Sequence, residues 1–235
     1  MRLLCGAPFP KRWAMIATWL LGGVIPFVTW QAAAQSAPDS GSIQAALVRL
    51  GASVPAQDLT HWIMRSLDHQ GLPFVVVDKR EARIFVFDRD GRMLGTAPAL
   101  LGLAKGDDGM KDLGDRPLAQ IKPEERTTPA GRYLAQVDRN ILGQTIIWVD
   151  YEQAISMHPV RSLNPREQRL ERLASPSVHD NRISYGCINV PVQFWQSVVL
   201  PAFRDTPGVV YVLPEVRPLE SVFIGLRVQK EAAAQ

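Results

Sequence analysis

Cys187 is the strongest candidate nucleophile in this sequence, and it lies in the stretch SYGCINVP (184–191). A thiolate attacks carbonyl carbon readily, but a free thiol is largely protonated at neutral pH, so catalysis requires a base beside it. The only other cysteine is Cys5, close to the first residue of the chain. If that N-terminal segment is removed, Cys187 has no partner for an internal disulfide, which favours a reactive thiol.

Four histidines are available to act as that base. His61 and His69 lie on or near an expected helix and have no motif around them. His158 ends an apolar, strand-like run (ISMHP), and the end of a strand is a rigid place from which a base can face a neighbouring loop. His179 precedes Cys187 within a polar loop. We therefore expect His158 to be the general base, with His179 as the alternative.

The elements that must position these residues are mostly β-strands. Short runs rich in β-branched and aromatic residues recur between polar turns, a pattern typical of strands. The Asp90-Gly91 pair predicts a turn between two of these runs. We expect strands over 74–78, 83–88, 93–101, 145–151, 154–158 and 208–215, and another after the Pro-Ala-Gly turn at 129–131.

A few helices complete the predicted fold. One short helix is expected over 43–50, and a second, with its apolar residues on one face, is expected to be capped by Asp58. Asn164, followed by a proline and then a glutamate, has the pattern of a helix start. The apolar stretch 192–203, after Cys187, is also helix-like. The fold class is therefore mainly β (α+β).

The N-terminal segment has the pattern of a secretory signal peptide. A basic, acid-free start precedes the apolar run 14–28, and the small residues Ala32 and Ala34 follow it. We expect cleavage after Ala34 and export to the periplasm or beyond. A transmembrane anchor is the alternative, but the run is short for a bilayer and is interrupted by glycine and proline.

The charge balance argues against polyanionic partners. The predicted signal peptide carries three of the 26 basic residues and none of the 23 acidic residues, so the remainder has equal numbers of both. This balance gives no reason to expect nucleic acid or an anionic membrane surface as a partner. The remainder is long enough for one domain with a sizeable core.

Four segments follow from these patterns. Residues 1–34 are the signal peptide, 35–72 a linker and N-terminal helical region, 73–216 the catalytic domain, and 217–235 a C-terminal tail. Two stretches within the domain, 103–126 and 160–183, interrupt the β pattern. The first is long for a structureless loop, which indicates a functional or mobile insertion.

The order of the motifs resembles a known family. The segment TTPAGRY (127–133), then the strand-borne His158, then SYGCIN (184–189) are similar to the signature of the L,D-transpeptidase (YkuD-like) catalytic domain. The resemblance covers roughly 74–215. It implies a β-sandwich-like domain with a helix after the catalytic cysteine, preceded here by a small N-terminal helical region.

The resemblance also implies an activity. The substrates would be peptidoglycan stem peptides: Cys187 would attack the carbonyl of a diamino-acid residue, release the terminal D-alanine and pass the acyl group to an amine-bearing acceptor peptide or protein. With water as the acceptor, the same chemistry gives an L,D-carboxypeptidase or amide hydrolase. A third reading is a catalytically silent cell-wall-binding protein on this scaffold.

Roles for single residues follow from the resemblance. His158 would accept the thiol proton, and the N–H of Cys187, with a neighbour near Gly186, would stabilise the oxyanion. Gly186 allows a tight turn, and Ser184 and Asn189 would orient the loop or the substrate. The reaction needs no metal and no cofactor, and the sequence offers no convincing cluster of metal ligands.

The sequence departs from the family pattern in two places. The family's histidine two residues before the cysteine is Tyr185 here, which keeps an aromatic ring and one hydrogen-bond donor but cannot act as a base at neutral pH. The gap between His158 and Ser184 is longer than usual, and the extra helix would form a lid or a wall of the substrate groove. The candidate substrate-binding residues are Tyr185 and, as a set that could receive a stem-peptide carboxylate, Arg132, Arg161 and Arg182.

Overall fold

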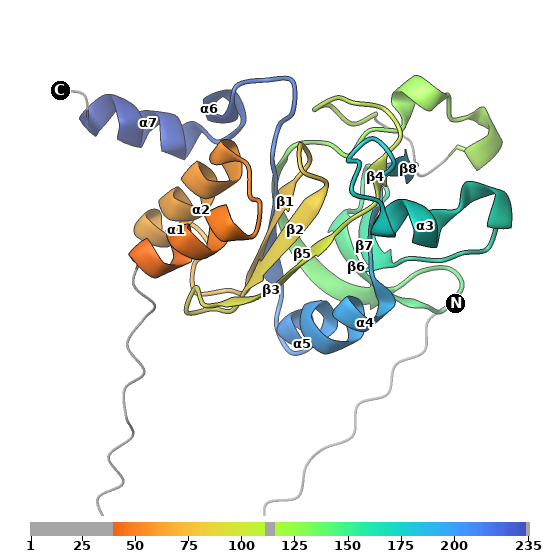
Figure 1. The fold of residues 1–235 in the computed structure, drawn as a ribbon, viewed down its shortest axis with the longest axis horizontal. Helices are drawn as coiled ribbons and strands as arrows, with labels where there is room; N and C mark the ends of the chain where they lie inside the picture. The colour runs from red at the N-terminus through yellow and green to blue at the C-terminus, as the bar shows by residue number, and fades with distance from the viewer. Residues whose placement is uncertain (1–39, 111–115, 234–235) are drawn as a thin grey trace, which may run out of the picture. The chain divides into compact units, whose positions relative to one another are not determined.

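The computed structural model describes residues 40–110 and 116–233 of the chain (Figure 1). The predicted signal peptide and its cleavage site lie outside these residues. The fold is mainly β, of the α+β class, as the sequence predicts. No helix within the described residues is long and apolar enough to cross a membrane.

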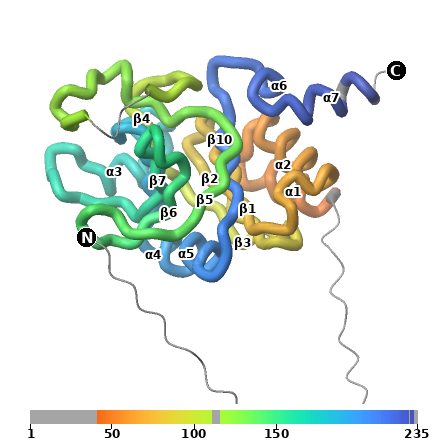
Figure 2. The backbone as a smooth tube through the Cα atoms, turned by 180° about the vertical axis from the view of Figure 1, so that it is seen from behind, coloured from red at the N-terminus to blue at the C-terminus, as the bar shows by residue number. Residues whose placement is uncertain are grey.

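Eight strands form one sheet in the order β3-β2-β1-β10-β5-β6-β7-β9, and β4 and β8 form a small second sheet. Figure 2 shows the last strand, β10, beside β1, with which it pairs in parallel. The strands are β1 (Phe74–Asp78), β2 (Arg83–Phe87), β3 (Met93–Pro98), β4 (Leu101–Gly102), β5 (Gly131–Arg139), β6 (Thr145–Asp150), β7 (Ile155–Pro159), β8 (Arg182–Ser184), β9 (Ile188–Val190) and β10 (Gly208–Val212).

The large sheet curls so that its two halves face each other across a core. A backbone bridge between Leu100 and Asn189 connects the chain just beyond β3 to β9, at the opposite end of the strand order. The core between the halves contains side chains of β1 and β2 on one side and of β6, β7 and β9 on the other. This arrangement agrees with the predicted sandwich-like fold and places β9 between the core and the surface that carries Cys187.

The helical segment after Cys187 closes this core, as expected. It consists of α4 (Val192–Phe194), the π-helical turn η5 (Trp195–Val199) and α5 (Leu200–Phe203). Trp195, Val199 and Phe203 are buried in the core between the two halves of the sheet. Burial of these large side chains fixes the end of the short strand β9, and therefore the loop that precedes it.

A second core covers the other face of β1, β2 and β10. It is formed by α1 (Ser40–Arg49), α2 (Val54–Ser66), α6 (Leu219–Val222) and α7 (Ile224–Ala233), which lie together on one side of the sheet in Figure 1. Strands β1 and β10 are consequently buried on both faces, which explains their continuous apolar sequences.

Two details of these helices differ from the prediction. Helix α2 begins earlier than expected, because Ser53 rather than Asp58 is its cap: the Ser53 Oγ accepts a hydrogen bond from the Ala56 N–H at 3.3 Å. The segment 217–235, expected to be a tail, contains α6 and α7. Leu219, Phe223 and Leu226 of this segment are buried against the sheet and the N-terminal helices.

The two long loops contain short helical turns. Within 103–126 the structure has η2 (Leu118–Gln120) and η3 (Pro123–Glu125), and 111–115 lie outside the described residues. Within 160–183 it has η4 (Pro165–Glu167) and α3 (Arg169–Ala174). Asn164 caps the first of these as expected, since its Oδ1 accepts from the Arg166 N–H at 3.1 Å.

Candidate active site

Strand pairing brings the predicted base and nucleophile to the same face of the sheet. Strands β7 and β9 are parallel neighbours, with His158 opposite Asn189. Because side chains alternate along a strand, Ser156 and His158 share one face of β7, as Cys187 and Asn189 do at the start of β9. The intervening side chains belong to the core: Ile155, Met157, Ile188 and Val190. The outward face therefore carries the four polar groups together.

His158 is held as a neutral imidazole. Its Nδ1 lies 2.9 Å from the carbonyl oxygen of Pro159, and since that oxygen can only accept, Nδ1 donates and Nε2 carries the lone pair. Burial lowers the pKa of His158 to about 4, and the charges of Arg161 and Arg169 act in the same direction, against the opposing effect of the Pro159 hydrogen bond. At neutral pH the Nε2 atom can accept a proton.

The Cys187 thiol is half-buried and contacts β7 and the turn that precedes it. Its Sγ lies 3.5 Å from the Ser156 Oγ and 3.7 Å from the Ala154 carbonyl oxygen. Among the hydrogen bonds of the described residues, none joins Sγ to an imidazole nitrogen. Instead the Asn189 Nδ2 lies 3.2 Å from the His158 Nε2 and 3.4 Å from the Cys187 carbonyl oxygen, so this amide links the imidazole to the backbone of Cys187.

The turn before Cys187 is held by two hydroxyl groups. The Ser184 Oγ donates to the Cys187 carbonyl oxygen at 2.7 Å and accepts from the Gly186 N–H at 3.0 Å. The Thr128 Oγ1 donates to the Gly186 carbonyl oxygen at 2.8 Å. Gly186 has φ 124°, and a Cβ there would lie 2.6 Å from the Thr127 carbonyl oxygen, so only glycine fits this turn.

This turn leaves the backbone N–H of Cys187 available. The Gly186 N–H donates to the Ser184 Oγ, so the second oxyanion donor expected near Gly186 would have to be another group. The Cys187 N–H has no acceptor among the hydrogen bonds of the described residues. Because a peptide group is planar and trans, the Cys187 N–H points away from the Gly186 oxygen that Thr128 binds. The N–H of the nucleophile itself is thus oriented by Thr128 and free to bind an oxyanion.

A buried ammonium group supports Thr128 from the other side. The Lys79 Nζ donates to the Thr128 carbonyl oxygen at 2.8 Å, to the Asp107 Oδ1 at 2.9 Å and to the Gly106 carbonyl oxygen. The Lys79 side chain is fully buried. Burial alone would raise the pKa of Asp107, but hydrogen bonds from Arg217, Glu215 and Lys79 outweigh it and lower the pKa to about 2. The Asp107 carboxylate is therefore ionised beside Lys79, whose own pKa is lowered by burial against the opposing effects of the Asp107 hydrogen bond and the charges of Glu215 and Asp107.

The four candidate substrate-binding residues are in different surroundings. Tyr185 lies beside the nucleophile, and the guanidinium of Arg126 covers its ring at 4.1 Å from the centroid. Arg161 is half-buried and close enough to His158 to lower its pKa. Arg132 and Arg182 are held in ion pairs instead: Arg132 with Asp68 at 2.7 Å, and Arg182, which is buried, with Glu215 at 2.6 Å. The structure does not gather the three arginines into one set.

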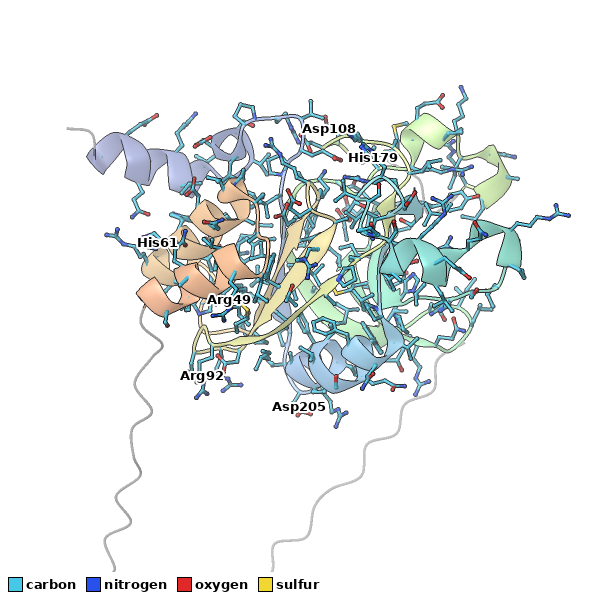
Figure 3. All side chains as sticks on the ribbon, viewed as in Figure 1. Arg49, His61, Arg92, Asp108, His179 and Asp205 are labelled. Carbon is cyan, nitrogen blue, oxygen red and sulfur yellow. The ribbon has the colours of Figure 1, made fainter. Side chains whose placement is uncertain are left out.

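The alternative base, His179, belongs to another surface. It lines a pocket of about 200 Å³ together with Arg80, Lys105 and Glu215, and among the described residues the hydrogen-bond contacts of the Cys187 Sγ are with Ser156 and Ala154 instead. Figure 3 labels His179 among the loops at the upper edge of the molecule. Within residues 40–110 and 116–233, no group of three or more His, Cys, Asp or Glu side chains is placed to hold a metal ion.

Three residues of the site were not predicted as such. Ser156 contacts the thiol, and strand alternation from His158 could have found it. Thr128 belongs to the motif TTPAGRY, but the role of its hydroxyl depends on a contact across 58 residues of sequence. Arg169, in the insertion, donates from Nη1 to the Asn189 Oδ1 at 2.7 Å. No pattern in the sequence indicates that contact.

Comparison with known proteins adds a distant likeness. No protein-family model and no curated protein matches the chain. Among solved structures, the helical cell shape determining protein Pgp2 from Campylobacter jejuni is similar, with 14% identity and a TM-score of 0.42 over 69% of this chain and 57% of that one. A substituted variant of Pgp2 gives 12% identity and a TM-score of 0.42, over 77% and 65%. The chain spans less than two thirds of either structure, and a likeness of this extent supports neither a family nor an activity.

Proposed function

We propose that this chain is a cysteine L,D-transpeptidase that acts on peptidoglycan stem peptides through an acyl-enzyme at Cys187. One observation carries the proposal: the thiol shares a strand face with a neutral imidazole whose Nδ1 is fixed on a carbonyl, beside a turn that leaves the Cys187 N–H free. A nucleophile, a base oriented by a third group and an oxyanion donor are the parts that acyl transfer requires. The motif order TTPAGRY, His158 and SYGCIN supports this family of reactions.

In the acylation step, the thiol proton passes to the His158 Nε2 while Sγ attacks the carbonyl carbon of the diamino-acid residue. The hydrogen bond from the Asn189 amide to Nε2 must break before this transfer. The tetrahedral oxyanion accepts a hydrogen bond from the Cys187 N–H. When the C–N bond to the terminal D-alanine breaks, the leaving nitrogen takes the proton from Nε2, and a thioester remains on Cys187.

In the second step, an amine of another stem peptide or of a protein attacks the thioester carbon. Nε2 accepts a proton from that nitrogen and returns it to the departing sulfur, so the enzyme is regenerated. If water attacks instead, the product is a shortened stem peptide. The acceptor is selected by the shape of the loops around Cys187 rather than by the catalytic groups.

The substrate carboxylate has one remaining candidate receptor from the predicted set. Arg161 lies close to His158, whereas Arg132 and Arg182 are occupied by Asp68 and Glu215. Tyr185 takes the position of the family's histidine, and Arg126 covers its ring, so this position contributes an aromatic wall rather than a base. We propose that Tyr185 and Arg161 contact the donor stem peptide on either side of the thiol.

The test is to incubate the purified protein with tetrapeptide muropeptides, with and without an acceptor amine, and to analyse the products by mass spectrometry. A cross-linked or amine-exchanged product with release of D-alanine supports the transpeptidase. Release of D-alanine without exchange would establish the L,D-carboxypeptidase instead. If neither occurs, and a carbapenem does not acylate Cys187, the proposed transpeptidase and the hydrolase both fail. Cys187→Ser is the control.

We propose in addition that this chemistry takes place after export, because the N-terminal pattern predicts a signal peptide. Expression of the full chain in a bacterial host, followed by N-terminal sequencing of the product, checks this. We expect a product that begins at Gln35 in the periplasmic fraction. A product that retains residues 1–34 in the membrane fraction would favour the anchor.

A further inference from the structure

The short helix α3, within the insertion 160–183, brings an arginine to the candidate active site. Both views place α3 close to β7 (Figures 1 and 2). The Arg169 side chain is only 13% exposed, its Nε is paired with the Glu167 carboxylate, and its Nη1 donates to the Asn189 Oδ1 at 2.7 Å. An arginine that is mostly buried, paired with an acid and aimed at a site residue has a defined orientation.

This contact determines which way the Asn189 amide faces. A guanidinium can only donate, so the Oδ1 of Asn189 must face Arg169 and the Nδ2 must face the His158 Nε2, at 3.2 Å. The Cys187 carbonyl oxygen, at 3.4 Å from Nδ2, favours the same orientation. Asn189 is 1% exposed, so bulk water does not compete for these contacts. The donor that faces Nε2 in turn requires the imidazole to carry its proton on Nδ1.

We propose that Arg169 is a positioning residue, which holds the Asn189 amide so that its NH2 group faces His158 and keeps the imidazole in the neutral form, with its proton on Nδ1 and its lone pair on Nε2. The insertion would thus supply part of the catalytic apparatus rather than only a wall of the groove. The effect on the reaction rests on the proposed function, whereas the contact and its effect on the imidazole do not.

Removal of Arg169 has two consequences of the same sign. The buried Oδ1 of Asn189 loses its donor, and the amide can turn so that Oδ1 faces Nε2, an arrangement that favours a protonated imidazole. A positive charge near the imidazole is also lost. The charged groups that act on His158 are Arg161 and Arg169, with Glu167 paired to Arg169. Arg161 has the charge without the contact to Asn189, so it serves as the matched control.

The experiment is NMR of the purified protein with 15N-labelled histidine, in which the pKa and the tautomer of His158 are followed over pH. In Arg169→Met we expect the pKa of His158 to rise by about one unit or more, since both the charge and the oriented donor are lost. Arg161→Met should raise it by less, with the proton still on Nδ1. Arg169→Lys, which keeps the charge and one donor, should stay close to the wild type.

If the pKa of His158 rises equally in Arg169→Met and Arg161→Met, then Arg169 acts only through its charge, and the proposal is overturned. If Arg169→Met does not fold, Asn189→Asp replaces the NH2 group by an acceptor while it keeps a partner for Arg169. The pKa of His158 must then rise, and an unchanged value would show that the amide never faced Nε2.

Kinetics give a second readout if the wild type processes muropeptides. Arg169→Met should lower kcat about tenfold with little change in KM and should move the acid limb of the pH profile upward, because the base is neutral only at higher pH. A purely structural role would leave that limb in place. If the wild type has no activity, the proposed function fails, while the NMR titration still decides the role of Arg169.

Discussion

Two buried polar clusters lie close to Cys187 and differ in how completely their groups are paired. In the first, the Lys79 network of Lys79, Asp107, Arg182 and Glu215, all three protons of the ammonium group have acceptors, and Arg182 binds both oxygens of Glu215. In the second, the candidate site of Cys187, His158 and Asn189, the Cys187 N–H has no acceptor among the described residues. The thiol there has only long contacts.

The difference follows from what each cluster is able to do. A fully paired buried network fixes a loop in one position, and changes in its members should appear as lost stability. A cluster that keeps unused donors and a lone pair gains little stability from them, but it can bind a reacting group. The Lys79–Thr128–Gly186 chain connects the two clusters, so the rigid one orients the reactive one.

The largest expected effect belongs to the nucleophile. Cys187→Ala should reduce the release of D-alanine from tetrapeptide muropeptides by about a thousandfold or more, because no other cysteine lies within residues 40–110 and 116–233. Its thermal midpoint should change little, since Sγ makes only long contacts. Ser156→Ala, which removes the nearest hydroxyl, is the matched control and should retain most of the activity. A Cys187→Ala variant that is as active as the wild type would show that Cys187 is not the nucleophile and that the second cluster is not a reactive site.

The Lys79 network should respond in the opposite way. Lys79→Met removes the closest cation from the buried Asp107 carboxylate and leaves only Arg217, at 3.9 Å, and we expect a loss of about 3–5 kcal/mol in the free energy of unfolding. The control is Arg132→Met, which breaks an ion pair of similar length whose side chains are 34% and 27% exposed. It should cost about 0–1 kcal/mol. Urea denaturation measures both, and equal losses would contradict the distinction.

The sequence predicted the strands that carry both clusters better than it predicted the side-chain contacts within the clusters. The strand over 74–78 has the predicted bounds, and the strand predicted over 154–158 is present as β7, Ile155–Pro159, because β-branched runs between turns are a strong local signal. Strands β8 and β9 have only three residues each, too few for any periodicity. They exist because β7 and the chain after β3 offer them partners.

The ion-pair partners of the predicted arginines could not be predicted from the sequence. Arg132 and Arg182 flank the motifs in sequence, but their partners, Asp68 and Glu215, are 64 and 33 residues away. Arg169, which was not predicted, reaches Asn189 across 20 residues. Local patterns determine which segment forms a strand. The pairing of long, flexible side chains depends on tertiary packing that no local pattern contains.

The pH dependence of the reaction tests whether His158 is neutral in the folded protein. Its lowered pKa, about 4, means that the base is unprotonated above that pH, so the acid limb of kcat/KM should lie near pH 4 rather than near 6.5. At pH 4.5 this predicts about a hundredfold more activity than an unperturbed histidine would allow. A bound substrate carboxylate beside Arg161 would oppose the lowering, so the limb of kcat should lie higher. A kcat/KM limb at pH 6–7 would contradict the buried, neutral imidazole.

The smallest effect tests the connection between the two clusters. Thr128→Val keeps the side-chain volume but removes the hydroxyl that binds the Gly186 carbonyl oxygen and accepts from the Gly102 N–H. We expect kcat to fall about tenfold, because the Cys187 N–H loses its fixed direction, with KM little changed. Thr127→Val is the matched control: its hydroxyl binds the Asp108 carbonyl oxygen and makes no hydrogen bond to the turn. If both variants lower kcat equally, the rigid network acts on the site through stability alone.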